Sequence, residues 1–268
     1  MSPYIGLVLA FLAFSLASVI TAKSIFTGAK VNYKLLFSSA IFAIVSQLVS
    51  VRFILFAENE LHLSLAAMCL LVNVLIVSVL TLRSLKFANL MILLVTYIFS
   101  ALLSVGLIFI PTNSFAYLGN TVNSSAPLFI HIILSMAAYC VLVISSLYAI
   151  QFRYIDAKLK AKTLSLNSHL PPLNIVESQH FRLMTVGLFL LSLALFTGFM
   201  FLDNMWDKQY AHKTVLSLIA WVMFAVLTLG HKQYGWRGNN SAITTIIASI
   251  VLTLAYFGSR FVKEILLI

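Results

Sequence analysis

The apolar residues of this chain fall into eight long runs, and each run is separated from the next by a shorter polar segment. A helix needs roughly 20 apolar residues to cross the hydrocarbon core of a bilayer, and each run is close to that length. The pattern predicts an all-α, polytopic membrane protein that forms a bundle of about eight transmembrane helices. The runs cover residues 3–21, 35–56, 63–82, 87–110, 127–150, 183–202, 214–230 and 241–259.

The composition agrees with a chain that lies mostly within the membrane. Hydrophobic residues make up 62% of the sequence and charged residues 9%, whereas soluble domains contain roughly a quarter charged residues. We expect one transmembrane domain over residues 1–268, with a motif-rich core at about 127–259. In the longest polar segment, 151–182, the pair Pro171-Pro172 disfavours helix before it. The preceding helix should therefore end near Lys162, and a separate short helix should lead from Ile175 into the next run.

The distribution of charge predicts how the bundle is oriented. The net charge is +10, and most Lys and Arg residues lie in alternate loops: Lys23, Lys30, Lys34, Arg83, Lys86, Arg153, Lys158, Lys160, Lys162, Arg182, Lys232 and Arg237. Basic loops stay on the cytoplasmic side, so both termini are predicted to be periplasmic. The positive charge is thus a topology signal, and the expected partner is the lipid bilayer and not nucleic acid.

His131 lies near the start of the run at 127–150 and is the most informative residue of the chain. An ionisable side chain inside a transmembrane segment marks a candidate functional site by default. Ser135 and Tyr139 follow at helical spacing, so the histidine shares its face with polar side chains. A lone imidazole on an apolar helix suits axial haem ligation, in which a ring nitrogen binds iron in a dry pocket. The alternative is a hydrogen bond from the imidazole to a neighbouring hydroxyl.

The predicted topology sorts the other five histidines by membrane side. His62 and His212 belong to the outer side with His131, and His212 is expected to be an interfacial residue. His169 and His180 fall in the polar segment before residue 183 and are expected to be solvated. His231 belongs to the cytoplasmic side, on the order of 25 Å from His131 across the bilayer core. These two histidines are therefore expected to be too far apart to bind the same metal ion.

Patterns that indicate an enzyme are not found in the sequence. Neither a pairing of nucleophile and base nor a cofactor-binding loop is visible, so no catalytic residue is expected. Cys69 and Cys140 both fall within apolar runs and form no metal-binding or redox motif. We expect both cysteines to be packing residues.

Several short motifs follow one another along the second half of the chain. They are His131-x-x-x-Ser135-x-x-x-Tyr139, Thr197-Gly198, Trp206-Asp207, Lys213-Thr214, Trp221, His231, Gly235-Trp236-Arg237-Gly238 and Tyr256-Phe257-Gly258. Their order and spacing resemble those of the cytochrome c assembly membrane family, which includes the haem-handling CcsA, CcmC and HemX-type proteins. The resemblance covers nearly the whole chain, and it is most specific in the five C-terminal helices.

The resemblance implies haem as a cofactor and a place in the bacterial inner membrane. In this family haem is handled between a cytoplasmic-side site and an outer site beneath a Trp-rich loop, with histidines as iron ligands. Matching positions make His131 an outer ligand and His231 a cytoplasmic-side ligand. Haem is a flat apolar ring with two propionates, so Trp206 is expected beside His131, and Trp236 and Arg237 beside His231. A cytochrome assembly component or another membrane protein is an expected partner.

Two departures from the family pattern keep a second function open. The Trp-rich outer segment is reduced to Met205-Trp206-Asp207, and the second apolar run carries Gln47 where a histidine partner would be sought. The alternative is a haem-free accessory or regulatory subunit of another membrane protein. Likewise, the segment 235–238 is either part of a haem site or a tight turn with an interfacial Trp anchor.

Overall fold

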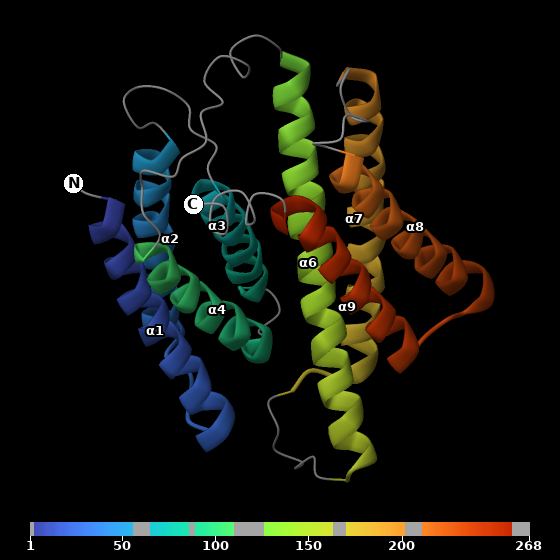
Figure 1. The fold of residues 1–268 in the computed structure, drawn as a ribbon. Helices are drawn as coiled ribbons and strands as arrows, with labels where there is room; N and C mark the ends of the chain where they lie inside the picture. The colour runs from blue at the N-terminus through green and yellow to red at the C-terminus, as the bar shows by residue number, and fades with distance from the viewer. Residues whose placement is uncertain are drawn as a thin grey trace. The chain divides into compact units, whose positions relative to one another are not determined.

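Figure 1 shows the chain in a computed structural model that describes residues 3–55, 65–85, 89–109, 126–162, 170–201 and 211–258. Within these ranges there are helices and no strands. Eight of the helices are long and apolar enough to cross a membrane. The all-α, polytopic fold predicted from the apolar runs is therefore confirmed. The elements are α1 (Pro3–Thr27), α2 (Tyr33–Leu55), α3 (Leu65–Ser84), α4 (Leu90–Ile108), α6 (Ala126–Lys160), α7 (Leu173–Phe201), α8 (Ala211–Tyr234), α9 (Asn239–Thr253) and the π-helical turn η3 (Leu254–Gly258).

The polar segment between α6 and α7 differs in part from the prediction. α6 ends at Lys160, close to the expected Lys162, but α7 is continuous from Leu173. A separate short helix from Ile175 is therefore wrong. The chain turns into helix directly after the proline pair, where the backbone oxygen of Pro172 accepts the N–H of Ile175 at 3.0 Å. No proline or glycine interrupts residues 173–186, so nothing in that stretch breaks the helix.

Contacts within the chain group the helices into two compact units, one of α1–α4 and one of α6–α9 with η3. In the first unit α1 packs along α2 and α4. Gly6 of α1 faces Ser46 and Ser50 of α2 so closely that a methyl group at Gly6 would collide with them. Such small residues let two helix backbones approach in a membrane, where packing takes over from the hydrophobic effect.

The first unit also encloses a polar cluster formed by Gln47, Asn73, Ser100 and Ser104 of α2, α3 and α4. Asn73 Nδ2 donates to Gln47 Oε1 at 3.0 Å, and Gln47 Nε2 donates to Ser104 Oγ at 2.9 Å. Ser100 Oγ is 2.9 Å from Asn73 Oδ1, and all four side chains are buried. We call these four residues the amide cluster; its hydrogen bonds join three apolar helices.

The second unit is built on the antiparallel pair α6 and α7, which share the most extensive contact among the described helices. Leu142 of α6 fills the space above Gly187 of α7, where a methyl group would collide with the leucine side chain. α9 packs against both α6 and α8. The candidate site residues that the structure describes all lie in this unit.

Candidate functional site

His131 lies one turn into α6 and is held by the facing helix α7. Its Nδ1 is 2.9 Å from the backbone oxygen of Ala194 and 3.3 Å from Thr197 Oγ1. Thr197 Oγ1 donates in turn to the oxygen of Ala194 at 2.9 Å. The ring is half-buried at this end of the unit. The predicted polar face of α6 thus turns towards another helix.

The hydrogen bond to Ala194 determines which nitrogen of His131 carries the proton. A backbone carbonyl oxygen can only accept, so Nδ1 must donate and the lone pair of the neutral ring is on Nε2. Metal-bound histidines commonly have this arrangement, because a carbonyl partner on one nitrogen orients the other towards the metal. His131 therefore has the tautomer and the fixed ring of an Nε2 ligand.

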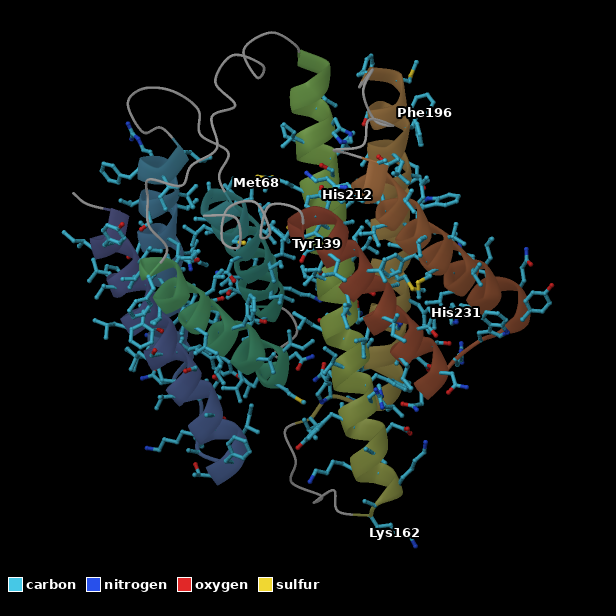
Figure 2. All side chains as sticks on the ribbon, viewed as in Figure 1. Met68, Tyr139, Lys162, Phe196, His212 and His231 are labelled. Carbon is cyan, nitrogen blue, oxygen red and sulfur yellow. The ribbon has the colours of Figure 1, made fainter. Side chains whose placement is uncertain are left out.

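Aromatic side chains lie two turns further along α6 from His131. Tyr139 stacks on Tyr256 with ring centroids 5.0 Å apart and meets the edge of Phe257 at 5.4 Å. Its hydroxyl is 3.1 Å from Thr253 Oγ1. Tyr256 and Phe257 belong to the π-helical turn η3, and such turns occur frequently at functional sites. Figure 2 shows Tyr139 on α6.

His231 lies in the last turn of α8 and is fixed on two sides. Its ring stacks on Phe181 of α7 with centroids 3.6 Å apart and an interplanar angle of 5°. Its Nδ1 is 2.8 Å from the backbone oxygen of Trp236, so Nδ1 again donates to a carbonyl and Nε2 carries the lone pair. His131 and His231 thus share one ligand-like arrangement on different helices.

The segment Gly235-Trp236-Arg237-Gly238 is a tight turn that folds back onto α8. Gly235 and Gly238 have φ values of +64° and +83°, which side chains rarely allow. Trp236 N–H donates to the oxygen of Gly230 at 3.2 Å, and Gly238 N–H donates to Glu177 Oε1 at 3.1 Å. A tight turn, one of the two alternatives for 235–238, is therefore present, and it places the Trp236 carbonyl against His231.

A groove of about 610 Å³ begins at this turn and runs between α8 and α9. Its walls are Val222, Met223, Val226 and Leu227 of α8, Trp236 and Arg237 of the turn, and Asn240, Ser241 and Thr244 of α9. Pockets for small ligands have volumes of roughly 300–1,000 Å³ and combine apolar walls with a few polar groups. The groove has this character, with Arg237 as the charged residue at its rim.

The two histidine sites contact α7 at well separated levels. His131 contacts Ala194 and His231 contacts Phe181, which are 13 residues apart on α7. A helix rises 1.5 Å per residue, so the contacts are about 20 Å apart. This supports the prediction that the two histidines cannot share one metal ion. Figure 2 shows His212 and His231 at opposite ends of α8.

Trp236 contacts His231 through its backbone oxygen, and Trp236 and Arg237 line the groove, of which His231 is not a lining residue. That Trp236 and Arg237 form a haem site with His231 stays a prediction. Trp206, expected beside His131, lies outside the described residues, as do His62 and His169. His212 is exposed at the first turn of α8, and its interfacial position stays a prediction.

The expectation that His180 is solvated is wrong. This residue is 2% exposed and lies within α7, where it bonds to Ser145 of α6. Its polar neighbours suggested a loop, but once residues 173–182 are helical it falls on the buried stripe with Val176 and Met184. That i, i+4 spacing is the signal in the sequence that could have found it.

The fold and the two sites define a polytopic membrane protein with two oriented imidazoles. One imidazole contacts α7 at Ala194 and the other contacts α7 at Phe181. Residues 5–267 match the family profile described as Cytochrome C assembly protein. Inner membrane protein YpjD of Escherichia coli strain K12 is 33% identical over 231 residues, which cover 85% of this chain and 86% of that protein. Cytochrome c biogenesis protein CcsA of Mesostigma viride is 22% identical over 154 residues, about half of each chain. No solved structure matches.

The chain therefore belongs to the cytochrome c assembly protein family. The resemblance drawn from the order of its motifs is confirmed. The segment Leu170-Pro171-Pro172-Leu173 and the sequence Leu252–Arg260 indicated YpjD in particular, and that likeness is also confirmed.

Proposed function

We propose that this protein binds or passes haem in the bacterial inner membrane, with Nε2 of His131 and Nε2 of His231 as axial ligands at separate sites. Membership of the cytochrome c assembly family and the likeness to an inner membrane protein support the coarse function and location. The single observation that carries the ligand assignment is the hydrogen bond from each Nδ1 to a backbone carbonyl.

At the His231 site the surroundings fit a flat apolar ring with acidic substituents. Phe181 covers one face of the imidazole and limits its rotation. Trp236 and the apolar wall of α8 offer flat and aliphatic surface, and Arg237 at the rim can pair with a propionate. The haem would supply the iron and its redox chemistry, whereas the protein would supply the ligand nitrogen, the apolar wall and the positive charge.

At the His131 site the described partners are Ala194 and Thr197, which orient the ring, and Tyr139 two turns away. Trp206 is proposed as the aromatic cover of this site from its position in the sequence. The site would lie on the periplasmic side if the basic loops are cytoplasmic, as charge predicts. Haem transfer between the two sites would then cross most of the bilayer.

The test is the visible spectrum of the protein purified in mild detergent from haem-replete cells, in oxidised and reduced form. We expect a Soret band in the wild type and its loss or reduction in His131→Ala and in His231→Ala. His212→Ala is the matched control, because His212 is exposed at the other end of α8 and should leave the band unchanged.

A wild-type protein that has no Soret band, even after haem is added, would contradict this function. In that case the haem-free accessory subunit becomes the supported alternative. A membrane partner recovered in a mild-detergent pull-down, and retained by the double variant His131→Ala/His231→Ala, would be the positive result for that alternative.

A further inference from the structure

The buried histidine His180 is not used by the proposed haem sites, and its two ring nitrogens have unequal surroundings. Nδ1 is 3.1 Å from the backbone oxygen of Ser145 and 3.1 Å from Ser145 Oγ. Because the carbonyl can only accept, Nδ1 carries the proton and Nε2 carries the lone pair. Ser145 Oγ donates to the backbone oxygen of His180 at 2.9 Å, which completes a two-way connection between α6 and α7.

The Nε2 lone pair lies against Thr245 of α9 and receives only a long contact there. The distance from Nε2 to Thr245 Oγ1 is 3.4 Å, beyond the usual range of a strong hydrogen bond. The Thr245 hydroxyl instead donates to the backbone oxygen of Ser241 at 2.9 Å. Thr245 Oγ1 is thus a partner of Nε2, but a long one, and a closer ligand would bind this lone pair more strongly.

The Thr245 hydroxyl also contacts a thioether sulfur, which is a soft metal ligand. Met184 Sδ is 3.8 Å from Thr245 Oγ1, and Met184 and Thr245 are both fully buried. Met184 follows His180 by four residues on α7, so the two side chains share one helix face. An imidazole nitrogen and a thioether sulfur of α7 therefore both lie within 3.8 Å of one hydroxyl oxygen of α9.

The chemistry of these three donors selects one class of ligand. His180 is 2% exposed and Met184 is fully buried, so a bulky ligand such as haem does not reach these two side chains. Hard divalent cations require several oxygen ligands, usually including carboxylates, and this point has one hydroxyl oxygen among the described residues. Thioether and imidazole ligands favour Cu(I). A single positive charge is also the least costly to bury among neutral donors.

We propose that His180 Nε2 and Met184 Sδ bind one Cu(I) ion inside the second unit, with Thr245 Oγ1 as a third contact. The ion would tie α7 to α9, and Ser145 would orient the imidazole from behind. This site uses none of the residues assigned to haem, so it stands or fails independently of the haem proposal.

The experiment titrates the full-length protein in mild detergent with Cu(I), kept reduced by ascorbate and buffered by a chromophoric Cu(I) chelator. The wild type should take one tightly bound Cu(I) from the chelator. His180→Gln and Met184→Leu should each lower its affinity by about a hundredfold or more, because loss of an outer-shell partner alone costs roughly 10–100-fold. Met91→Leu is the matched control, since Met91 lies in α4 of the first unit. Its affinity should equal that of the wild type.

Two further measurements separate loss of a ligand from loss of the fold. X-ray absorption should show a sulfur scatterer in the wild type that disappears in Met184→Leu, a substitution that nearly conserves volume. Cu(I) should raise the melting temperature of the wild type and leave that of Met184→Leu unchanged. The site is overturned if the wild type takes no Cu(I) from the chelator. It is equally overturned if bound copper has the same affinity in Met184→Leu and in the wild type.

Discussion

His131 and His180 join the same two helices by hydrogen bonds that run in opposite directions, one from α6 to α7 and one from α7 to α6. Nδ1 of His131, on α6, donates to the backbone oxygen of Ala194 on α7, and Nδ1 of His180, on α7, donates to the backbone oxygen of Ser145 on α6. Each partner lies 14 residues from the other histidine on its own helix, which is about 21 Å of helix rise. One antiparallel register therefore satisfies both bonds.

Replacement of the buried His180 should lower the free energy of unfolding more than replacement of the half-buried His131. His180→Ala leaves a cavity between α6 and α9 and a Ser145 hydroxyl with one partner fewer, so we expect a loss of about 1–3 kcal/mol in the free energy of unfolding. His131→Ala should cost about 0.5–1.5 kcal/mol. Thermal unfolding in detergent, monitored by circular dichroism, measures both, with His212→Ala as the control that should match the wild type.

The relative order of these two losses is the informative result. Equal losses would contradict the burial difference between the two imidazoles. An unchanged midpoint in His180→Ala would show that its bond to Ser145 contributes nothing measurable to the α6–α7 contact.

The helices of this protein could be predicted because eight apolar runs of suitable length leave few alternatives in a membrane. The ends of α6 and α7 could not be predicted in the same way, because an apolar run stops where polar residues begin, whereas the helix continues. α6 and α7 each continue about ten residues into polar sequence, to Lys160 and from Leu173. One side of these polar turns is buried, and this burial keeps them helical. The apolar runs alone did not indicate it.

The candidate site was predictable where the partners are close in sequence. Trp236 follows His231 by five residues, and the two glycines around it indicated the turn. The stack of Phe181 on His231 joins residues 50 apart, and it depends on how α7 and α8 pack. The burial of His180 likewise depends on α6 and α9, so no local pattern around it could reveal its partners.

Gly230 provides a test of how the turn supports the His231 site. A methyl group at this position would collide with the Trp236 ring. Gly230→Ala should therefore displace the indole and weaken the bond between His231 and the Trp236 carbonyl. We expect a changed tryptophan emission spectrum and a smaller Soret band from the His231 site.

Gly106→Ala is the matched control for this substitution. Gly106 lies in α4, and a methyl group there would meet no atom within 4 Å apart from its own helix. Alanine in an open helix position should stabilise the protein by about 0.5–1 kcal/mol, with no change in the spectrum. If Gly230→Ala also raised the stability and left the emission unchanged, the Trp236 ring would not depend on Gly230.

Glu177 links the start of α7 to the turn before α9. Its Oε1 accepts the N–H of Gly238, the residue that precedes α9, and a negative charge is favourable at a helix N-terminus. Glu177→Ala should lower the free energy of unfolding by about 0.5–2 kcal/mol. Glu177→Gln keeps an acceptor oxygen and should cost less than half as much. Chemical denaturation of both variants measures the difference, and equal costs would mean that the hydrogen bond is not what stabilises the turn.

The amide cluster of the first unit provides the last prediction. Gln47 and Asn73 bond to each other, whereas Ser100 and Ser104 also donate to carbonyls of their own helix, Thr96 at 2.8 Å and Ser100 at 2.8 Å. The serines therefore keep a backbone partner when an amide is removed. The remaining amide keeps its bond to a serine but loses its bond to the other amide. Hydrogen bonds between membrane helices are worth about 0.6 kcal/mol on average, up to roughly 1.7.

Gln47→Leu and Asn73→Leu should each cost about 1–3 kcal/mol, because each leaves one buried amide group of the other residue, Asn73 Nδ2 or Gln47 Oε1, without the partner it has in the wild type. The double variant Gln47→Leu/Asn73→Leu should then cost clearly less than the two single losses added together, since no amide group that has lost its partner remains. Unfolding in detergent of the wild type, both single variants and the double variant gives the coupling energy directly. Strictly additive losses would mean that the two amides act independently and that the cluster is not one hydrogen-bonded unit.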